Sequence, residues 1–536
     1  MLGISKVLVQ NSAKALVFLV LVAIAFRVFS VFVVPEPAYN DSVYHLELAK
    51  TILSGDAIPA GSPPLLYHYI LEGFFGSTGF PMAWPFVKII PLIVMAVQLL
   101  LAFLLFKKMF PKHYLIPLLF VAANPWMTRI GSVNMVDSFA AAVMLFSFYA
   151  IYSFAVSKNP AEEKKFAVLS IVSFVAVVLT KLNLLVALPF MILGFIVLFA
   201  KKTMLFEKKS LQKKEKKWFS KEIIFFAAVV LVSIGLPLAV FLVSPSASSI
   251  IPTGGSHGAG TPADAVLSVN IFEAFNPSVL FQAYLGFFDF PPATAFSKIP
   301  LISSLPILPL SIIFALIVLP IFLLFAKEII SVFQSAFLNF RKKKAFDGIT
   351  IFLLMITFSI LTGIIPAISV VRNESWYIRY FIPFFPLAAV LITNGFAKLK
   401  NRNFKAIFIS SLVLFSIFSF ALTSTSALFY QGVEKENAPL FNYINSNSEI
   451  NDIASFNKAR DLTYYTRFGE KKIIELNLQE GFSLDELKNQ IFEKNPSYII
   501  STCYNDPLSE KLPLLEEEGL VEKIFDGGCS AAYRVL

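Results

Sequence analysis

The chain has 536 residues, of which 57% are hydrophobic, and its mean hydropathy is +0.72. A soluble protein of this length cannot bury so much apolar surface, so the composition excludes a purely soluble enzyme and predicts a polytopic membrane protein. The formal net charge of +10 fits either nucleic acid or anionic lipid as a partner. The distribution of the basic residues along the chain favours lipid.

About eleven segments are long and apolar enough to cross a membrane, which takes about 20 residues each. The first, 13–34, is too long for the core of a signal peptide, so we expect it to be retained. The run 166–200 breaks at the polar Thr180-Lys181-Leu182-Asn183 and predicts two short spans. The other predicted spans are 86–106, 114–126, 135–154, 223–243, 301–325, 349–371, 377–392 and 406–422. The predicted fold class is therefore a polytopic α-helical membrane protein.

Alternate loops differ sharply in charge, which predicts the orientation of the chain. One set carries nearly all the loop lysines and arginines, and its densest basic run lies between Lys201 and Lys221. By the positive-inside rule this set is cytoplasmic, so the N-terminus is inside and the C-terminus outside the cell membrane. Contact with anionic lipid explains the basic run, and we expect no nucleic-acid partner.

The chain divides into a membrane domain, 1–429, and an extracytoplasmic tail, 430–536. Two large loops join the tail outside: 35–85, which holds a polar motif, and 244–300, whose Gly- and Pro-rich start predicts a flexible flap. In the tail the apolar runs shorten and alternate, which predicts a small α/β domain. Its predicted strands are 452–456, 472–476, 497–502 and 521–525, and its predicted helices are 439–446, 459–468, 484–493 and 509–518.

The chain has two cysteines, Cys503 and Cys529, each at or just beyond a predicted strand of the tail. If the tail is external, it lies in a compartment that permits disulfides. We therefore predict a disulfide between them. Two cysteines without neighbouring histidines match no zinc or haem spacing.

The polar motif after the first span holds the strongest candidates for chemistry. Asp41 comes first, and Tyr44 and His45 lie one helical turn further along, on the same face of a helix. Helix capping is the structural alternative for Asp41. Keeping a carboxylate among apolar residues at a membrane surface costs free energy, which favours a functional role for Asp41. Tyr67 follows in a second motif, Pro63-Pro64-Leu65-Leu66-Tyr67.

Four charged residues from distant segments are expected at the same membrane face. Asp137 is the only acid in the segment 135–157, and Lys181 lies at the polar tip. Arg372 and Arg379 flank Glu374 and Trp376 around the turn between the predicted spans 349–371 and 377–392. The alternatives are a span end that reaches water for Asp137, snorkelling for Lys181 and interfacial anchoring for the arginines. Together with Asp41 they give two carboxylates and three cations, which suits an anionic, lipid-linked substrate.

These motifs resemble a family of membrane enzymes. Asn40-Asp41-Ser42-Val43-Tyr44-His45-Leu46-Glu47-Leu48-Ala49 and the Tyr67 motif resemble the first external loop of the GT-C superfamily of glycosyltransferases. That superfamily includes protein O-mannosyltransferases, aminoarabinose-type lipid A transferases and oligosaccharyltransferases. The segment from Asn124 to Asp137 resembles its second acidic site, and Thr180-Lys181 and 377–386 resemble later segments.

The resemblance implies a glycosyltransferase that moves a hexose or pentose from a polyprenyl-phosphate donor to a hydroxyl of a protein, lipid or glycan. It implies Asp41 and Asp137 as catalytic residues. The residues expected to bind substrate are Tyr44, His45, Tyr67, Lys181, Arg372 and Arg379.

In the expected inverting reaction, Asp41 is the general base and the cations stabilise the leaving phosphate. No cofactor is expected. Ser138, not a second acid, follows Asp137, so no metal site is predicted and a divalent cation stays an open alternative. The rival function is a transporter or lipid flippase, although the sequence shows no internal repeat between its halves.

Overall fold

The computed structural model describes residues 2–38, 40–58, 65–78, 86–181, 184, 187–210, 284, 288, 307–342, 346–371, 381–456, 459–466, 471–478, 481–503 and 506–536. The predicted span 223–243, nearly all of the predicted flap, and Arg372 and Arg379 lie outside these residues.

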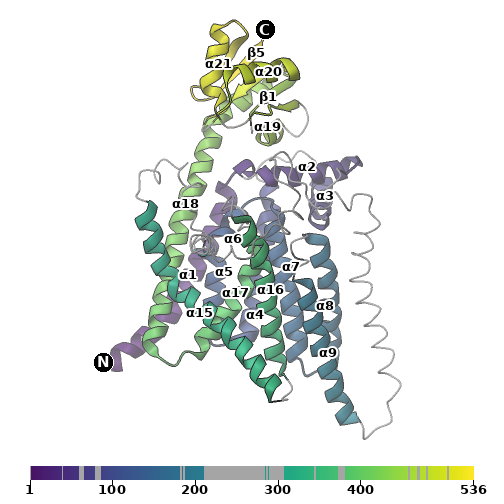
Figure 1. The fold of residues 1–536 in the computed structure, drawn as a ribbon, viewed down its shortest axis with the longest axis vertical. Helices are drawn as coiled ribbons and strands as arrows, with labels where there is room; N and C mark the ends of the chain where they lie inside the picture. The colour runs from purple at the N-terminus through teal and green to yellow at the C-terminus, as the bar shows by residue number, and fades with distance from the viewer. Residues whose placement is uncertain are drawn as a thin grey trace.

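Long apolar helices form a bundle that makes up most of the molecule (Figure 1). They are α1 (Leu2–Val33), α4 (Ile89–Met109), α5 (Leu115–Ala122), α7 (Val136–Val156), α8 (Pro160–Thr180), α9 (Leu188–Ser210), α15 (Ile307–Arg341), α16 (Gly348–Val371), α17 (Phe385–Lys398) and α18 (Arg402–Ser446). One continuous apolar core runs between them. Among the described residues, 6 helices are long and apolar enough to cross a membrane, so the chain is a multi-pass membrane protein. The total of about eleven crossings stays a prediction.

The predicted crossing 114–126 consists of two helices. α5 ends at Ala122, and the short α6 (Pro125–Ile130) begins three residues later. Asn124 is the N-cap of α6, because its side-chain oxygen accepts a hydrogen bond from the backbone N–H of Met127 at 3.0 Å. Pro125 at the first helical position has no N–H to leave unpaired. The Asn-Pro pair therefore starts a new helix within the apolar run.

The first loop folds into short helices at the end of the bundle that also carries the tail (Figure 1). They are the 3-10 turn η1 (Glu36–Ala38), α2 (Asn40–Ser54), α3 (Leu66–Thr78) and the 3-10 turn η2 (Phe86–Lys88). Apolar residues of α2 and α3 share a small core with the starts of α4 and α7. This core is formed by Val43, Leu46, Ala49, Tyr67, Leu71, Phe75, Val87, Ile90, Val94 and Val136. The described helices η1, α2, α3 and η2, here called the platform, thus pack on the bundle.

The tail contains a five-stranded mixed sheet with the order β2-β1-β3-β5-β4. Its elements are β1 (Asp452–Ser455), α19 (Ala459–Tyr465), β2 (Lys472–Glu475), α20 (Leu484–Lys494), β3 (Tyr498–Ser501), α21 (Leu508–Glu517), β4 (Val521–Asp526) and β5 (Ala531–Val535). β1 pairs in parallel with β2 and β3, and β5 is antiparallel to both β3 and β4. The first four strands lie at the predicted positions, whereas β5 was not predicted.

Helices cover both faces of this sheet, and one of them comes from the bundle. α20 and α21 supply the core of one face. The other face packs on α19 and on Leu440, Phe441 and Ile444 at the end of α18. The predicted helix 439–446 is therefore the last part of a 45-residue helix that begins in the bundle. A single continuous helix therefore joins the membrane-spanning part to the tail.

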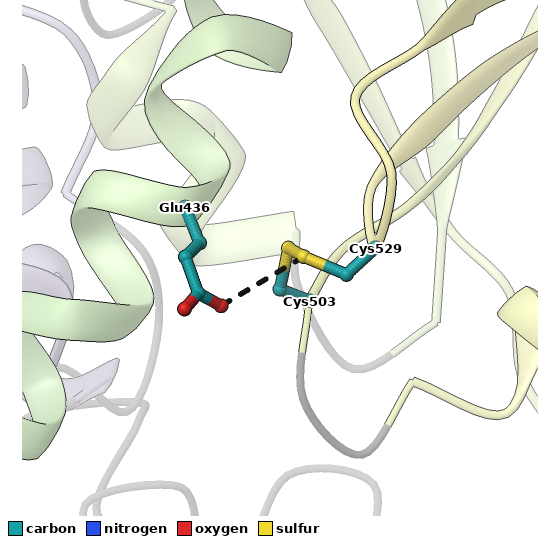
Figure 2. A group of neighbouring side chains, drawn as sticks. All are labelled: Glu436, Cys503 and Cys529. Carbon is teal, nitrogen blue, oxygen red and sulfur yellow. Dashed lines mark hydrogen bonds between the residues drawn. A yellow bond between two sulfur atoms is a disulfide. The ribbon is translucent and has the colours of Figure 1, made fainter.

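A disulfide joins Cys503, just after β3, to Cys529, in the turn between β4 and β5 (Figure 2). It is the pair that the sequence predicts. The backbone N–H of Cys503 donates a hydrogen bond of 2.8 Å to the side-chain oxygen of Asn437 on α18. Glu436, the neighbouring residue of α18, lies with a carboxylate oxygen 3.8 Å from the Cys529 sulfur. The cross-link thus lies where the sheet meets α18.

Candidate functional site

Helix α2 presents three predicted site residues at the platform. Asp41 lies in its first turn and is half-buried, and Tyr44 and His45 follow one turn later. An acid in the first turn interacts favourably with the positive end of the helix dipole. Tyr44 is half-buried, and its ring centroid is 5.8 Å from that of the buried His45. The sequence therefore places the carboxylate at the helix end and an imidazole one turn deeper.

A pair of buried imidazoles connects α2 to α3. His45 Nδ1 and His68 Nε2 are 2.9 Å apart, and one ring must donate while the other accepts. The ring of Tyr67 meets that of His45 edge-on, with centroids 6.1 Å apart, and lies 5.4 Å from Phe139 of α7. His68 was not among the predicted site residues. The platform is therefore held together by aromatic side chains.

Tyr67 is buried with its hydroxyl directed at the turn between α6 and α7. The hydroxyl donates to the side-chain oxygen of Asn134, with the two oxygens 3.4 Å apart. Burial, together with the negative charge of Glu36, raises the pKa of Tyr67 well above its ordinary value. The phenol therefore stays protonated at neutral pH and acts as a hydrogen-bond donor.

Asp137 and Lys181, predicted from separate segments, form an ion pair. Asp137 is buried in the first turn of α7, and Lys181 directly follows α8. The ammonium group donates a hydrogen bond to the carboxylate. α7 and α8 pack side by side, which brings the two charges together at one end of the bundle. The positive charge of Lys181 is thus held beside an acid in this state.

The sequence analysis missed a second, fully buried ion pair. Lys88 Nζ lies 2.7 Å from Glu36 Oε1, and both side chains are 0% exposed. The other carboxylate oxygen of Glu36 accepts hydrogen bonds from the Ser42 hydroxyl and from the backbone N–H of Asn134. A signal was present: Lys88 lies inside a predicted span, and ionisable residues in such positions usually have a partner.

A buried polar group in the bundle reaches the residue next to Asp137. Arg27 of α1 donates to the Gln98 side-chain oxygen at 2.9 Å and to the Met127 carbonyl at 3.1 Å. The Gln98 amide in turn donates to the Ser138 hydroxyl at 2.9 Å and to its carbonyl. Within the described residues, no carboxylate pairs with Arg27. Arg27 and Gln98 both lie in predicted spans, so these polar residues could be recognised from the sequence.

The tail reaches the platform through α19, which packs on α2 and η1. Tyr464 of α19 packs against the apolar core shared by α2 and α3. Burial, with the negative charges of Glu36 and Glu434 of α18, raises the pKa of Tyr464 far above its ordinary value. The sequence analysis gave α19 no role beside the predicted site.

Among the residues that the structure describes, potential metal ligands do not gather around the predicted acids. Among the described residues, the one group of three possible ligands close enough to share an ion is Glu436, Cys503 and Cys529. The two sulfurs of this group are joined to each other (Figure 2). A metal-binding cysteine must be a thiolate, so this arrangement does not fit a metal.

No protein-family model and no curated protein matches the sequence. Solved structures do match in fold. ArnT from Cupriavidus metallidurans in the apo state matches with a TM-score of 0.52 and 12% identity over 98% of both chains. The Archaeoglobus fulgidus oligosaccharyltransferase in complex with zinc and sulfate matches with a TM-score of 0.50 and 14% identity, over 91% of this chain and 67% of that chain.

ArnT bound to undecaprenyl phosphate matches over 97% of this chain and 98% of that chain, with a TM-score of 0.47 and 11% identity. The likeness to apo ArnT and to the oligosaccharyltransferase, both GT-C glycosyltransferases, shows that this chain shares their fold.

Proposed function

We propose that the chain is a membrane glycosyltransferase that moves a sugar from a polyprenyl-phosphate donor to an acceptor hydroxyl. The GT-C fold supports a transferase. The observation that carries the proposal is the place of Asp41. It lies in the first turn of α2, in the platform beneath the tail, at the end of the bundle that holds the Asp137–Lys181 pair.

A lipid-linked donor agrees with two features. The ArnT protein whose fold this chain shares has been solved with undecaprenyl phosphate, a polyprenyl phosphate. If the platform faces the outside, as the loop charges predict, cytoplasmic nucleotide sugars do not reach it. A donor anchored in the membrane by its lipid can reach the platform.

In the proposed reaction the acceptor oxygen attacks the anomeric carbon while the bond from that carbon to the phosphate oxygen breaks. Asp41 takes the proton of the acceptor hydroxyl as general base. The polyprenyl phosphate leaves as an anion that needs no general acid, and attack from the opposite face inverts the anomeric centre. Lys181, Arg372 and Arg379 stabilise the developing charge on the phosphate, and Asp137 orients the sugar or the acceptor. The proposed reaction uses no cofactor.

Replacing Asp41 tests the proposal. Purified protein in lipid is given a polyprenyl-phosphate sugar and acceptors without any nucleotide, and sugar transfer is measured. We expect Asp41→Asn to lower kcat by roughly 100- to 10,000-fold, because the amide cannot take the proton. Binding of the donor lipid should change little, since Asn keeps the size of the side chain.

Asp56→Asn is the matched control. Asp56 is an exposed acid just beyond the end of α2, and its replacement should leave transfer at the wild-type rate. Unchanged turnover in Asp41→Asn would remove Asp41 as the base. A wild-type protein that moves the intact donor lipid across the bilayer without transferring sugar would point instead to a flippase.

A further inference from the structure

The Glu36–Lys88 pair is completely enclosed and has several polar partners. Glu36 Oε1 accepts from Lys88, and Glu36 Oε2 accepts from the Ser42 hydroxyl and from the Asn134 backbone N–H at 2.9 Å. Lys88 also donates to the Ser132 carbonyl at 3.2 Å. The carboxylate therefore accepts a hydrogen bond from each of three separate chain segments.

These partners lie next to the two predicted acids. Ser42 directly follows Asp41, and Asn134 comes three residues before Asp137. The Asn134 side chain also donates to the Val87 carbonyl at 3.0 Å, which secures the same turn to η2. A single carboxylate therefore connects the start of α2 to the turn that leads into α7.

We propose that Glu36 and Lys88 are positioning residues, which fix the segment that carries Asp41 relative to the segment that carries Asp137. The inference rests on the proposed transferase reaction, in which both acids face one substrate. Glu36 contributes the acceptor oxygens. Lys88 holds Glu36 in place through the ion pair and through its own hydrogen bond to the Ser132 carbonyl.

A structural role alone does not explain this pair well. Taking two charges out of water is unfavourable, and apolar residues of similar size often replace a buried ion pair without loss of stability. What an apolar pair lacks is the set of acceptors for Ser42 and Asn134. The pair therefore contributes by fixing the geometry of the two segments.

Two double variants separate geometry from charge. Glu36→Gln with Lys88→Met removes both charges, but the Gln amide oxygen still accepts from Ser42 and Asn134. Glu36→Leu with Lys88→Met also removes both charges and leaves no acceptor. Neither variant leaves one buried charge without its partner, which makes both suitable for a folded protein.

We expect the Leu/Met variant to stay folded with a lower thermal midpoint, because Ser42 and Asn134 lose their acceptor, and to keep its KM for the donor lipid. Its kcat should fall 10- to 100-fold, because displaced reacting groups lower the rate without weakening binding. The Gln/Met variant should recover at least half of the wild-type kcat. A lower kcat of equal size in both variants would show that charge, not position, matters, and would overturn the proposal.

Hydrogen–deuterium exchange gives a readout that does not depend on transfer. In the Leu/Met variant, peptides covering 40–48 and 131–139 should exchange faster than in the wild type, and in the Gln/Met variant they should not. Unchanged exchange of both peptides in the Leu/Met variant would contradict the proposal. If the wild type transfers no sugar, the proposed function fails, and exchange alone decides the positioning role.

The ion pair between Lys202 and Glu163 is the control. It has the same separation of 2.7 Å but joins α8 to α9, and each side chain is 16% exposed. Glu163→Gln with Lys202→Met should change neither kcat nor exchange in the two peptides. A similar loss in this control would mean that any disturbed ion pair lowers turnover, and would contradict a specific role for Glu36.

Discussion

Gln98 shows how much a single side chain holds together in the bundle. It is fully buried in α4, accepts from Arg27 and donates to Ser138. A buried donor or acceptor that loses its partner costs about 1–3 kcal/mol. Since Ser138 follows Asp137, the amide also supports the turn of α7 that carries the acid.

We predict that Gln98→Leu destabilises the protein by about 1–3 kcal/mol, because the buried Arg27 loses an acceptor. The thermal midpoint of the detergent-purified protein should fall. Val97→Leu, at the lipid-facing neighbouring position, is the control and should leave the midpoint unchanged. Equal midpoints in both variants would show that Arg27 finds another acceptor.

At the residue level, the candidate site residues that the sequence offers are those that stand out locally. The polar motif around Asp41 and His45 follows a long apolar run, so it is visible without a structure. Glu36 and Lys88 were missed because their role follows from the contact between them, and they are 52 positions apart in the sequence. The same holds for Asp137 and Lys181: each was predicted, but their pairing depends on how α7 packs on α8.

At the level of elements, α19 is the link between the tail and the platform. The side chain of Tyr464 on α19 packs against the apolar core of the platform, which includes Val43 and Tyr67. The neighbouring Tyr465 stacks on Phe441 of α18, with ring centroids 4.0 Å apart. The helix is therefore fixed to α18 on one side and covers α2 on the other.

We predict that Tyr464→Ala loosens this contact and speeds hydrogen exchange in α2 by roughly tenfold, which corresponds to about 1.4 kcal/mol of lost local stability. Peptides from α20 and α21 should not change, because their core lies on the other face of the sheet. Phe492→Ala on α20 removes an exposed ring and serves as the control. If α2 exchanged at the wild-type rate in Tyr464→Ala, the contact with α19 would not stabilise the platform, and the prediction would be wrong.

Two elements differ from the prediction for local reasons. The sequence predicted one crossing where Asn124-Pro125 ends α5 and starts α6, although this pair is a recognisable helix start. The last strand, β5, was missed because it is only five residues long and begins with two alanines, which are depleted in strands. Gly527-Gly528 before it was the available signal, since a glycine pair after a strand often makes a hairpin turn. Gly528 has a φ of +83°, which few other residues adopt.

At the scale of the whole molecule, α18 determines where the tail lies. The helix runs through the bundle and supplies Leu440, Phe441 and Ile444 to the core of the tail. The N-terminus lies at the opposite end of the molecule (Figure 1). The platform, the Asp137–Lys181 pair and the tail therefore share one end, and the orientation of this end decides which donors reach it.

The charge distribution predicts that this end faces outward, and cysteine labelling tests it. Both native cysteines are in the disulfide, so the unreduced protein provides a background without free thiols. We predict that Ser77→Cys, exposed on α3, reacts with a membrane-impermeant maleimide in intact cells. Lys158→Cys, exposed at the opposite end between α7 and α8, should react only after the cells are opened. The reverse pattern would place Asp41 in the cytoplasm, where nucleotide sugars are present, and would remove the main reason for a polyprenyl-phosphate donor.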